Sequence, residues 1–463
     1  MRRIGLLLVL GALPAVVLPR LARAQTPAAA PATIGAPASP TLATPPEAPA
    51  PKQVVTLAQA ERSALEQQPQ MHVARSNTDI AEAQAGQARA PMLPQVNAQA
   101  GYTRETGNFA PRPGVVGASP GGSVFAQSYD YWNFNVTGTQ LIYDFGQTSQ
   151  RYKAASFNVD VQRYGEQTIR LQVLLNVRTA YFNARAMKEL VAVARETLDD
   201  QNKHLAQVQG QVQVGTQPPI ALAQQKAACA NAVVQVIQSQ NNYETAKAQL
   251  NQAAGIVAGT EYDVGDEEVA APDDEDMPLE ALVSKAVAAR PEIATFSKQR
   301  ESQEATLNSA RGAYGPTLSA LAGATDSGLQ LNAMVPNWNA GLLLNWPIFQ
   351  GGLTQAQIRQ AEAGLAGIEA QKSLEVLSVR LQVDTARLTV KAAKATIGAS
   401  QDALDSSREQ LRLAEQRFAT GVGNIIELND AQVTYTTAAA QVVQARFGLA
   451  SARAQLLAAL GRP

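Results

Sequence analysis

An internal duplication constrains the fold of this chain more than any other feature of its sequence. Residues 57–103 align without a gap on residues 279–325, and residues 132–255 align on residues 338–461. The matched positions include Pro69 with Pro291, Pro94 with Pro316, Gly101 with Gly323, Trp132 with Trp338 and Gly215 with Gly421. Shared helix-rich composition would not align prolines, glycines and tryptophans in this way. The sequence therefore predicts two copies of one structural unit.

The two copies differ in length at one place. The offset between matched residues is constant within each of the two alignments but is smaller in the second, so the first copy is longer between Thr103 and Tyr131. Length differences between related segments belong in exposed loops. We therefore predict a loop in each copy, formed in the first by the Gly- and Pro-rich residues 107–122.

The N-terminus predicts export. Two arginines, an apolar run and an Ala-Arg-Ala site are typical of a cleaved signal peptide, and the apolar run is too short to span a bilayer comfortably. We expect the chain to divide into a signal peptide (1–24), a disordered Pro/Ala-rich tether (25–53), a first repeat (54–255), an acidic linker (256–278) and a second repeat (279–463).

The segments that flank the predicted loops alternate between apolar and polar residues, as strands do. The face expected to contact lipid consists of Trp132, Phe134, Val136, Trp338, Leu342, Leu344 and Trp346. Trp338 and Trp346 would lie roughly 19 Å apart along a membrane normal, near the spacing of two aromatic girdles. An ordinary sandwich strand would explain one such segment equally well, but four of them in an exported chain favour a barrel.

Four strands cannot close a membrane barrel, because even small barrels need about eight strands. The unpaired edges must be satisfied by other chains. We therefore expect an oligomer whose copies share one barrel; three copies, for example, would provide twelve strands.

Each predicted hairpin is followed by an exceptionally long proline-free segment. A helix over residues 148–213 would extend about 100 Å at 1.5 Å per residue. We predict that the helices reverse at Val214, Gly215 and Thr216 in the first copy, and at Thr420, Gly421 and Val422 in the second, where glycine permits a left-handed cap. A soluble coiled-coil scaffold or adaptor would explain these helices but not the tryptophan-bearing strands.

The composition indicates no catalytic, metal or nucleic-acid site. The net charge is −1, Cys229 is the single cysteine, and neither histidine has a cysteine or acid at ligand spacing. We expect His72 and His204 to be surface residues, and the acidic stretch 261–280 to be a solvated linker. We find no cofactor motif, and an exported hydrolase would need a constellation of residues that the sequence does not show.

The chain resembles the TolC-type outer membrane efflux family. The resemblance rests on the duplicated order of elements, on Pro-Ile-Phe-Gln-Gly-Gly at 347–352 and on Arg-Phe-Ala-Thr-Gly at 417–421. It implies a mostly helical α+β fold, a trimeric twelve-stranded outer-membrane barrel and a long periplasmic helical tunnel. It also implies a periplasmic adaptor, which would contact the six turn residues, and an inner-membrane pump of the RND or ABC type.

The resemblance also implies an acidic ring at the tunnel mouth. Glu427 and Asp430 occupy the matching positions, whereas the first copy has Ala221 and Gln224 there. The alternative is that these acids only favour a helix N-terminus. Members of the family often close the mouth with an arginine and a tyrosine. Here those positions hold Gly423 and Phe418, so we expect no charged latch of that type.

Overall fold

The computed structural model describes residues 53–106, 128–256, 262–267, 271–272 and 274–463. The predicted signal peptide, nearly all of the predicted tether and the predicted loop over 107–122 lie outside the described residues. The described elements all belong to the unit formed by residues 52–463.

Each copy begins with a short helix and then a longer helix, and the longer helix starts at a proline. In the first copy these are α1 (Leu57–Gln67) and α2 (Pro69–Arg89), followed by the 3-10 turn η1 (Ala90–Met92); in the second they are α5 (Leu279–Ala289) and α6 (Pro291–Gly312). Gln68 and Arg290, which precede the prolines, are extended, as a residue before proline prefers. Thr56 caps the start of α1 in a full capping box.

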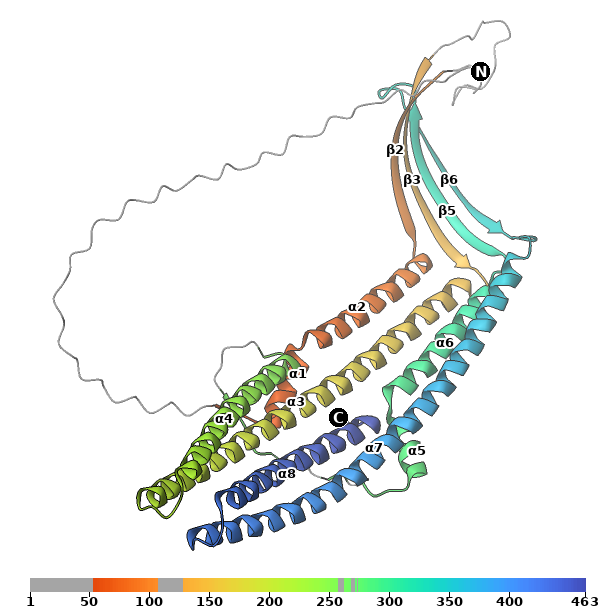
Figure 1. Ribbon diagram of the computed structural model, residues 1–463. Coiled ribbons are helices and arrows are strands. Elements are labelled where there is room, and N and C mark those ends of the chain that lie inside the picture. The colour runs from red at the N-terminus through yellow and green to blue at the C-terminus, as the bar shows by residue number, and fades with distance from the viewer. Residues whose placement is uncertain (1–52, 107–127, 257–261, 268–270, 273) are drawn as a thin grey trace, which may run out of the picture. The chain divides into compact units, whose positions relative to one another are not determined.

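The four predicted strands form one antiparallel sheet. They are β2 (Gln95–Thr106), β3 (Ser128–Tyr143), β5 (Thr317–Gly328) and β6 (Val335–Asn345), in the order β2-β3-β5-β6. The pairing of β3 with β5 thus joins the hairpin of the first copy to the hairpin of the second (Figure 1). Only residues 329–334 separate β5 from β6, whereas 107–127 separate β2 from β3. The length difference therefore lies where the alignment predicted it.

The long helices are as long as predicted, and equal in the two copies. Helices α3 (Gln147–Gln213) and α7 (Leu353–Ala419) each contain 67 residues. Each follows a glycine with φ of 83°, Gly146 or Gly352, a conformation that most side chains disfavour. The return helices are α4 (Pro219–Ala254) and α8 (Ile425–Ala459).

The helices pack side by side in a layer that has two open edges. Toward the strands the neighbours run α2-α3-α6-α7, and toward the reversal turns they run α4-α3-α8-α7 (Figure 1). Two related core clusters hold the middle of the layer. One joins α1, α3 and α4 around Val177 and Leu250, and the other joins α5, α7 and α8 around Val383 and Leu456. Among the described helices, none is long and apolar enough to cross a membrane.

A small parallel sheet was not predicted. Strand β1 (Gln53–Val55) pairs with β4 (Tyr262–Val264), so the end of the predicted tether and part of the predicted linker are ordered together. Tyr262 and Val264 are buried in the first core cluster. The pairing joins the two segments that flank the first repeat, and local sequence patterns cannot indicate a contact between segments so far apart.

Candidate functional site

The turns that end α3 and α7 have the same backbone. Gly215 and Gly421 have φ of 79° and 77°. In each turn the residue after the glycine donates its N–H to a carbonyl five residues back, Thr216 to Gln211 and Val422 to Arg417, as in a Schellman cap. All six predicted turn residues are exposed. The two tips therefore present similar backbones with different side chains.

Glu427 and Asp430 both lie exposed at the start of α8. Asn424 caps this helix, because its Oδ1 accepts a hydrogen bond from the Glu427 N–H at 2.8 Å. Arg417, at the end of α7, places Nε 3.0 Å from Oε1 of Glu427. Arg417 belongs to the motif at 417–421, but its ion pair with Glu427 has no signal in the sequence, because the two residues meet only across the turn.

The tips enclose a hydrophobic cluster, here called the tip cluster. Its buried members are Val208, Ala221, Leu411, Ala414, Phe418, Ile425, Leu428, Ala431 and Tyr435. Ala221, the first-copy counterpart of Glu427, is 2% exposed, while the side chain of Glu427 is 43% exposed. The equivalent positions of the two copies therefore face different surroundings.

Phe418 and Gly423, the two positions where we expect no charged latch, are closely packed. Phe418 is fully buried in the tip cluster. A Cβ atom at Gly423 would lie 3.0 Å from both Cβ of Arg417 and the backbone nitrogen of Phe418. A side chain at position 423 would thus require the end of α7 to shift slightly.

The strand register aligns the predicted lipid-facing residues on one face. Val136 pairs with Ala324, which pairs with Trp338 on its other side. Residues that pair directly across antiparallel strands share a face. The other predicted lipid-facing residues of β3 and β6 lie at alternate positions along these strands, so they lie on the same face. Trp338, Leu342 and Leu344 are 78%, 70% and 63% exposed in the single chain. Trp346 lies one residue beyond the end of β6, and its indole N–H donates to the Tyr314 carbonyl.

The chain matches a known protein family in two segments, one in each copy of the repeat. Residues 61–256 and 282–462 match the family model described as outer membrane efflux protein. The chain belongs to the outer membrane efflux protein family. As an outer membrane efflux protein it acts in the outer membrane, and its family consists of channels rather than enzymes.

Relatives of low sequence identity are also named as outer membrane proteins. Outer membrane protein TolC of Escherichia coli (strain K12) is 23% identical over 435 residues, which cover 88% of this chain and 83% of TolC. The probable outer membrane lipoprotein SilC of Salmonella typhimurium is 25% identical over 309 residues, covering 65% of this chain and 62% of SilC. The aligned part of this chain thus spans less than two thirds of SilC.

Solved structures show the same fold. The Campylobacter jejuni CmeC outer membrane channel superposes with a TM-score of 0.73 at 18% identity, covering 88% of this chain and 85% of CmeC. A CusC structure superposes with a TM-score of 0.75 at 18% identity, covering 91% of this chain and 99% of CusC.

The acidic linker of this efflux protein is not simply solvated, contrary to the sequence prediction. Glu275 is buried and pairs with Arg453 of α8 and Lys394 of α7. Asp274 is also buried and pairs with Lys285 and with Arg462 near the C-terminus. Lys394, Arg453 and Arg462 lie far away in sequence, so local composition could not reveal these partners. Asp273 lies outside the described residues.

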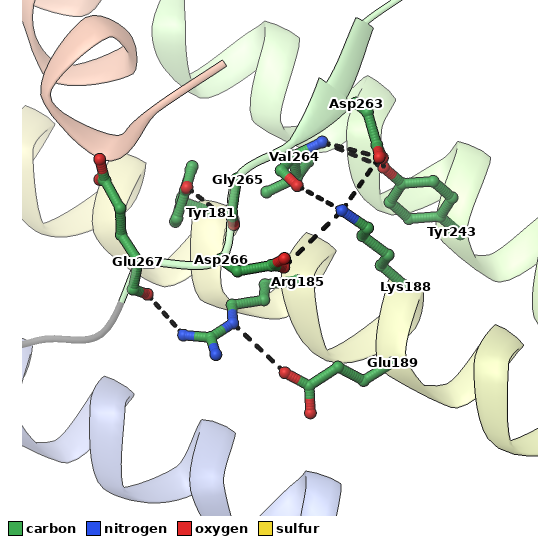
Figure 2. A network of polar contacts seen from close by, with 10 residues as sticks. All are labelled: Tyr181, Arg185, Lys188, Glu189, Tyr243, Asp263, Val264, Gly265, Asp266 and Glu267. Carbon is green, nitrogen blue, oxygen red and sulfur yellow. Dashed lines mark hydrogen bonds and ion pairs between the residues drawn. The ribbon is translucent and has the colours of Figure 1, made fainter. Parts of the chain in front are cut away.

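The preceding part of the linker is held by a polar network (Figure 2). Lys188 of α3 places Nζ 2.9 Å from a carboxylate oxygen of Asp263 and donates to the Val264 carbonyl at 2.7 Å. Tyr181 donates its hydroxyl to the Gly265 carbonyl at 3.0 Å, and burial raises the pKa of Tyr181 to about 12. These contacts fix the first linker segment against α3.

The prediction for His204 was also wrong. His204 is 6% exposed, and its Nε2 lies 3.2 Å from Oε1 of Glu415 on α7. His72 is exposed, as expected. Within the described residues, no group of three or more His, Cys, Asp or Glu side chains is arranged to hold a metal ion.

Proposed function

We propose that this efflux protein is the passive exit duct of a tripartite efflux or type I secretion system. In this proposal it forms a homotrimer, and its turns contact a periplasmic adaptor that connects it to an inner-membrane pump of the RND or ABC type. No catalytic activity is expected. The observation that carries the proposal is that the sheet and the helical layer are both open at two edges.

The sheet supports closure by other copies. Strands β2 and β6 are the edges of the four-stranded order, and open strand edges must be covered or paired. Three copies would give twelve strands, within the range of outer-membrane barrels. The largely apolar face that contains Val136, Trp338 and Leu342 would then contact lipid. A soluble scaffold would leave this face in water.

The helical edges support the same closure. Leu374, Leu377 and Leu381 form a stripe on α7 and are 68%, 64% and 68% exposed. On α2, at the opposite edge, Val73 and Ile80 are 60% and 55% exposed. Residues three, four and seven apart share one helix face. Packing α7 of one copy against α2 of the next would cover both stripes.

Glu427 and Asp430 are proposed to form the acidic ring at the mouth. Threefold repetition would bring six carboxylates together, which raises the local concentration of cations and disfavours anions. The Arg417 ion pair would offset part of the charge of Glu427, so Asp430 would contribute more of the field.

The cargo is proposed to be set by the pump. The names of relatives refer to pyoverdine export, cation efflux and toluene efflux, which involve chemically unrelated cargoes. Because one family serves such different cargoes, the wall of the proposed duct need not bind any of them specifically.

The proposal predicts single-channel conductance of the purified protein in planar bilayers, with a preference for cations. Replacing both mouth acids, Glu427→Ala with Asp430→Ala, should move the reversal potential in a salt gradient toward zero while conductance persists. The reason is that the variant removes six carboxylates from the narrowest part of the proposed duct.

A matched control is Glu301→Ala with Glu304→Ala, which removes two acids three residues apart on α6, near the strands. This control should change the reversal potential much less. An unchanged reversal potential in the mouth variant would refute the ring alone. A water-soluble monomer without conductance would refute the duct and favour a scaffold.

A further inference from the structure

A cavity lies on the helical layer between the strands and the tips. It has a volume of about 790 Å³ and is lined by α2, α3 and α6, together with Glu375 of α7. These helices are neighbours in the layer (Figure 1). The volume falls within the usual range for small-molecule sites, roughly 300–1,000 Å³.

Apolar side chains from three helices line this cavity. Val73 comes from α2, Ile169 from α3 and Phe296 from α6. An aromatic ring can contact an apolar ligand and can also attract a cation over its face. The cavity therefore suits a ligand with an apolar body.

The charged side chains that line the cavity are all acidic. They are Glu166, Glu292 and Glu375, and the described lining contains no lysine, arginine or histidine. Glu166 has a distant partner, with its Oε1 3.6 Å from Nε of Arg75. Glu375 forms no hydrogen bond or ion pair with the described residues. The cavity thus carries an excess of negative charge.

Glu292 provides the sharpest indication of a missing partner. Its Oε2 is buried and has no hydrogen-bond partner among the described residues. Nearby hydroxyls are already used within their own helices, since Thr168 donates to the Tyr164 carbonyl and Thr295 donates to the Pro291 carbonyl. A buried carboxylate oxygen without a partner is costly.

Neighbouring features do not neutralise Glu292. It lies in the first turn of α6, where the helix dipole favours an acid only modestly. Arg290 is two residues away, but its guanidinium donates to the Ala459 carbonyl at 2.9 Å and to Oε1 of Gln382 at 2.7 Å. The carboxylate is therefore positioned to receive a positive charge from outside the chain.

We propose that this cavity binds an amphiphilic organic cation, a small molecule with an aromatic or apolar body and one positive charge. Ile169 and Phe296 would contact the body, while Glu292 and Glu375 would attract the charge. The site is separate from the tips, and its occupancy does not require the channel to conduct.

The test uses two probes of the same shape and opposite charge, tetraphenylphosphonium and tetraphenylborate. Their binding to the purified full-length protein in a nonionic detergent would be measured by isothermal titration calorimetry. We expect saturable binding of tetraphenylphosphonium that is at least tenfold tighter than binding of tetraphenylborate. Glu292→Gln should weaken tetraphenylphosphonium binding about tenfold, and Glu375→Gln about threefold.

Glu369→Gln is the matched control, because Glu369 lies on the same helix as Glu375, is 58% exposed and pairs with Arg300. It should change affinity less than twofold. Equal binding of both probes, absence of saturable binding, or equal effects of Glu369→Gln and Glu375→Gln would overturn the proposal. Circular dichroism of each variant separates lost binding from lost folding, and Glu375→Gln still tests the site if Glu292→Gln fails to fold.

Discussion

The two tips of the long helices share a backbone and differ in what surrounds it. The first tip is neutral, and its return helix starts at Pro219 without a side-chain cap. The second is capped by Asn424, carries Glu427 and Asp430, and joins its two helices through Arg417. Duplication therefore preserved the turn geometry while the side chains diverged.

Burial explains why the two tips could not carry the same charges. Ala221 lies in the tip cluster beside residues such as Phe418 and Leu428, whereas Glu427 at the equivalent position is exposed. An acid at position 221 would be removed from water without a partner, which is unfavourable. The comparison teaches that an aligned position in a duplicated chain is not always an equivalent environment.

The largest expected effect comes from exchanging alanine and glutamate between the aligned positions 221 and 427. Ala221→Glu should destabilise the tips by about 3–5 kcal/mol, because it leaves an uncompensated buried charge. Glu427→Ala should cost less than about 1 kcal/mol, because it removes an exposed ion pair. Thermal unfolding and amide hydrogen exchange of the tip helices would measure both. Similar losses in the two variants would show that the tips are equivalent after all.

A smaller effect is expected from the close packing of Gly423. Gly423→Ala should destabilise the second tip by about 1–3 kcal/mol, because the new methyl group meets Arg417 and Phe418 at 3.0 Å. Its first-copy counterpart, Gln217, is the control, and Gln217→Ala should change the free energy of unfolding by less than about 0.5 kcal/mol. Chemical denaturation of both variants tests this difference. Equal stability would mean that the end of α7 can move aside.

The smallest effect is expected where the tips are alike. Gly215→Ala and Gly421→Ala should each cost about 1–2 kcal/mol, because both glycines have positive φ and neither has an atom within 4 Å of an added Cβ. The two costs should agree within about 0.5 kcal/mol, as measured by thermal unfolding. A clear inequality would show that the shared backbone is held differently in the two copies.

The sequence determined the elements whose causes are local or periodic. Alternating residues predicted the four strands, and proline-free segments predicted α3 within one residue of its bounds. Glycines predicted the reversal turns. These features follow from steric limits of the backbone and from the period of each element, and the duplication provided each observation twice. The resemblance then placed Glu427 and Asp430 at the tip.

Only the tertiary structure decided which distant residues meet. It paired β1 with β4, buried Asp274 and Glu275 against cations of α7, α8 and the C-terminus, and joined His204 to Glu415. It also showed Ala221 inside the tip cluster, and Oε2 of Glu292 without a hydrogen-bond partner among the described residues. Such contacts depend on how helices rotate and pack against one another. A local pattern specifies that an element forms, but burial and partnership are set by neighbours from other parts of the chain, often from the other copy of the repeat.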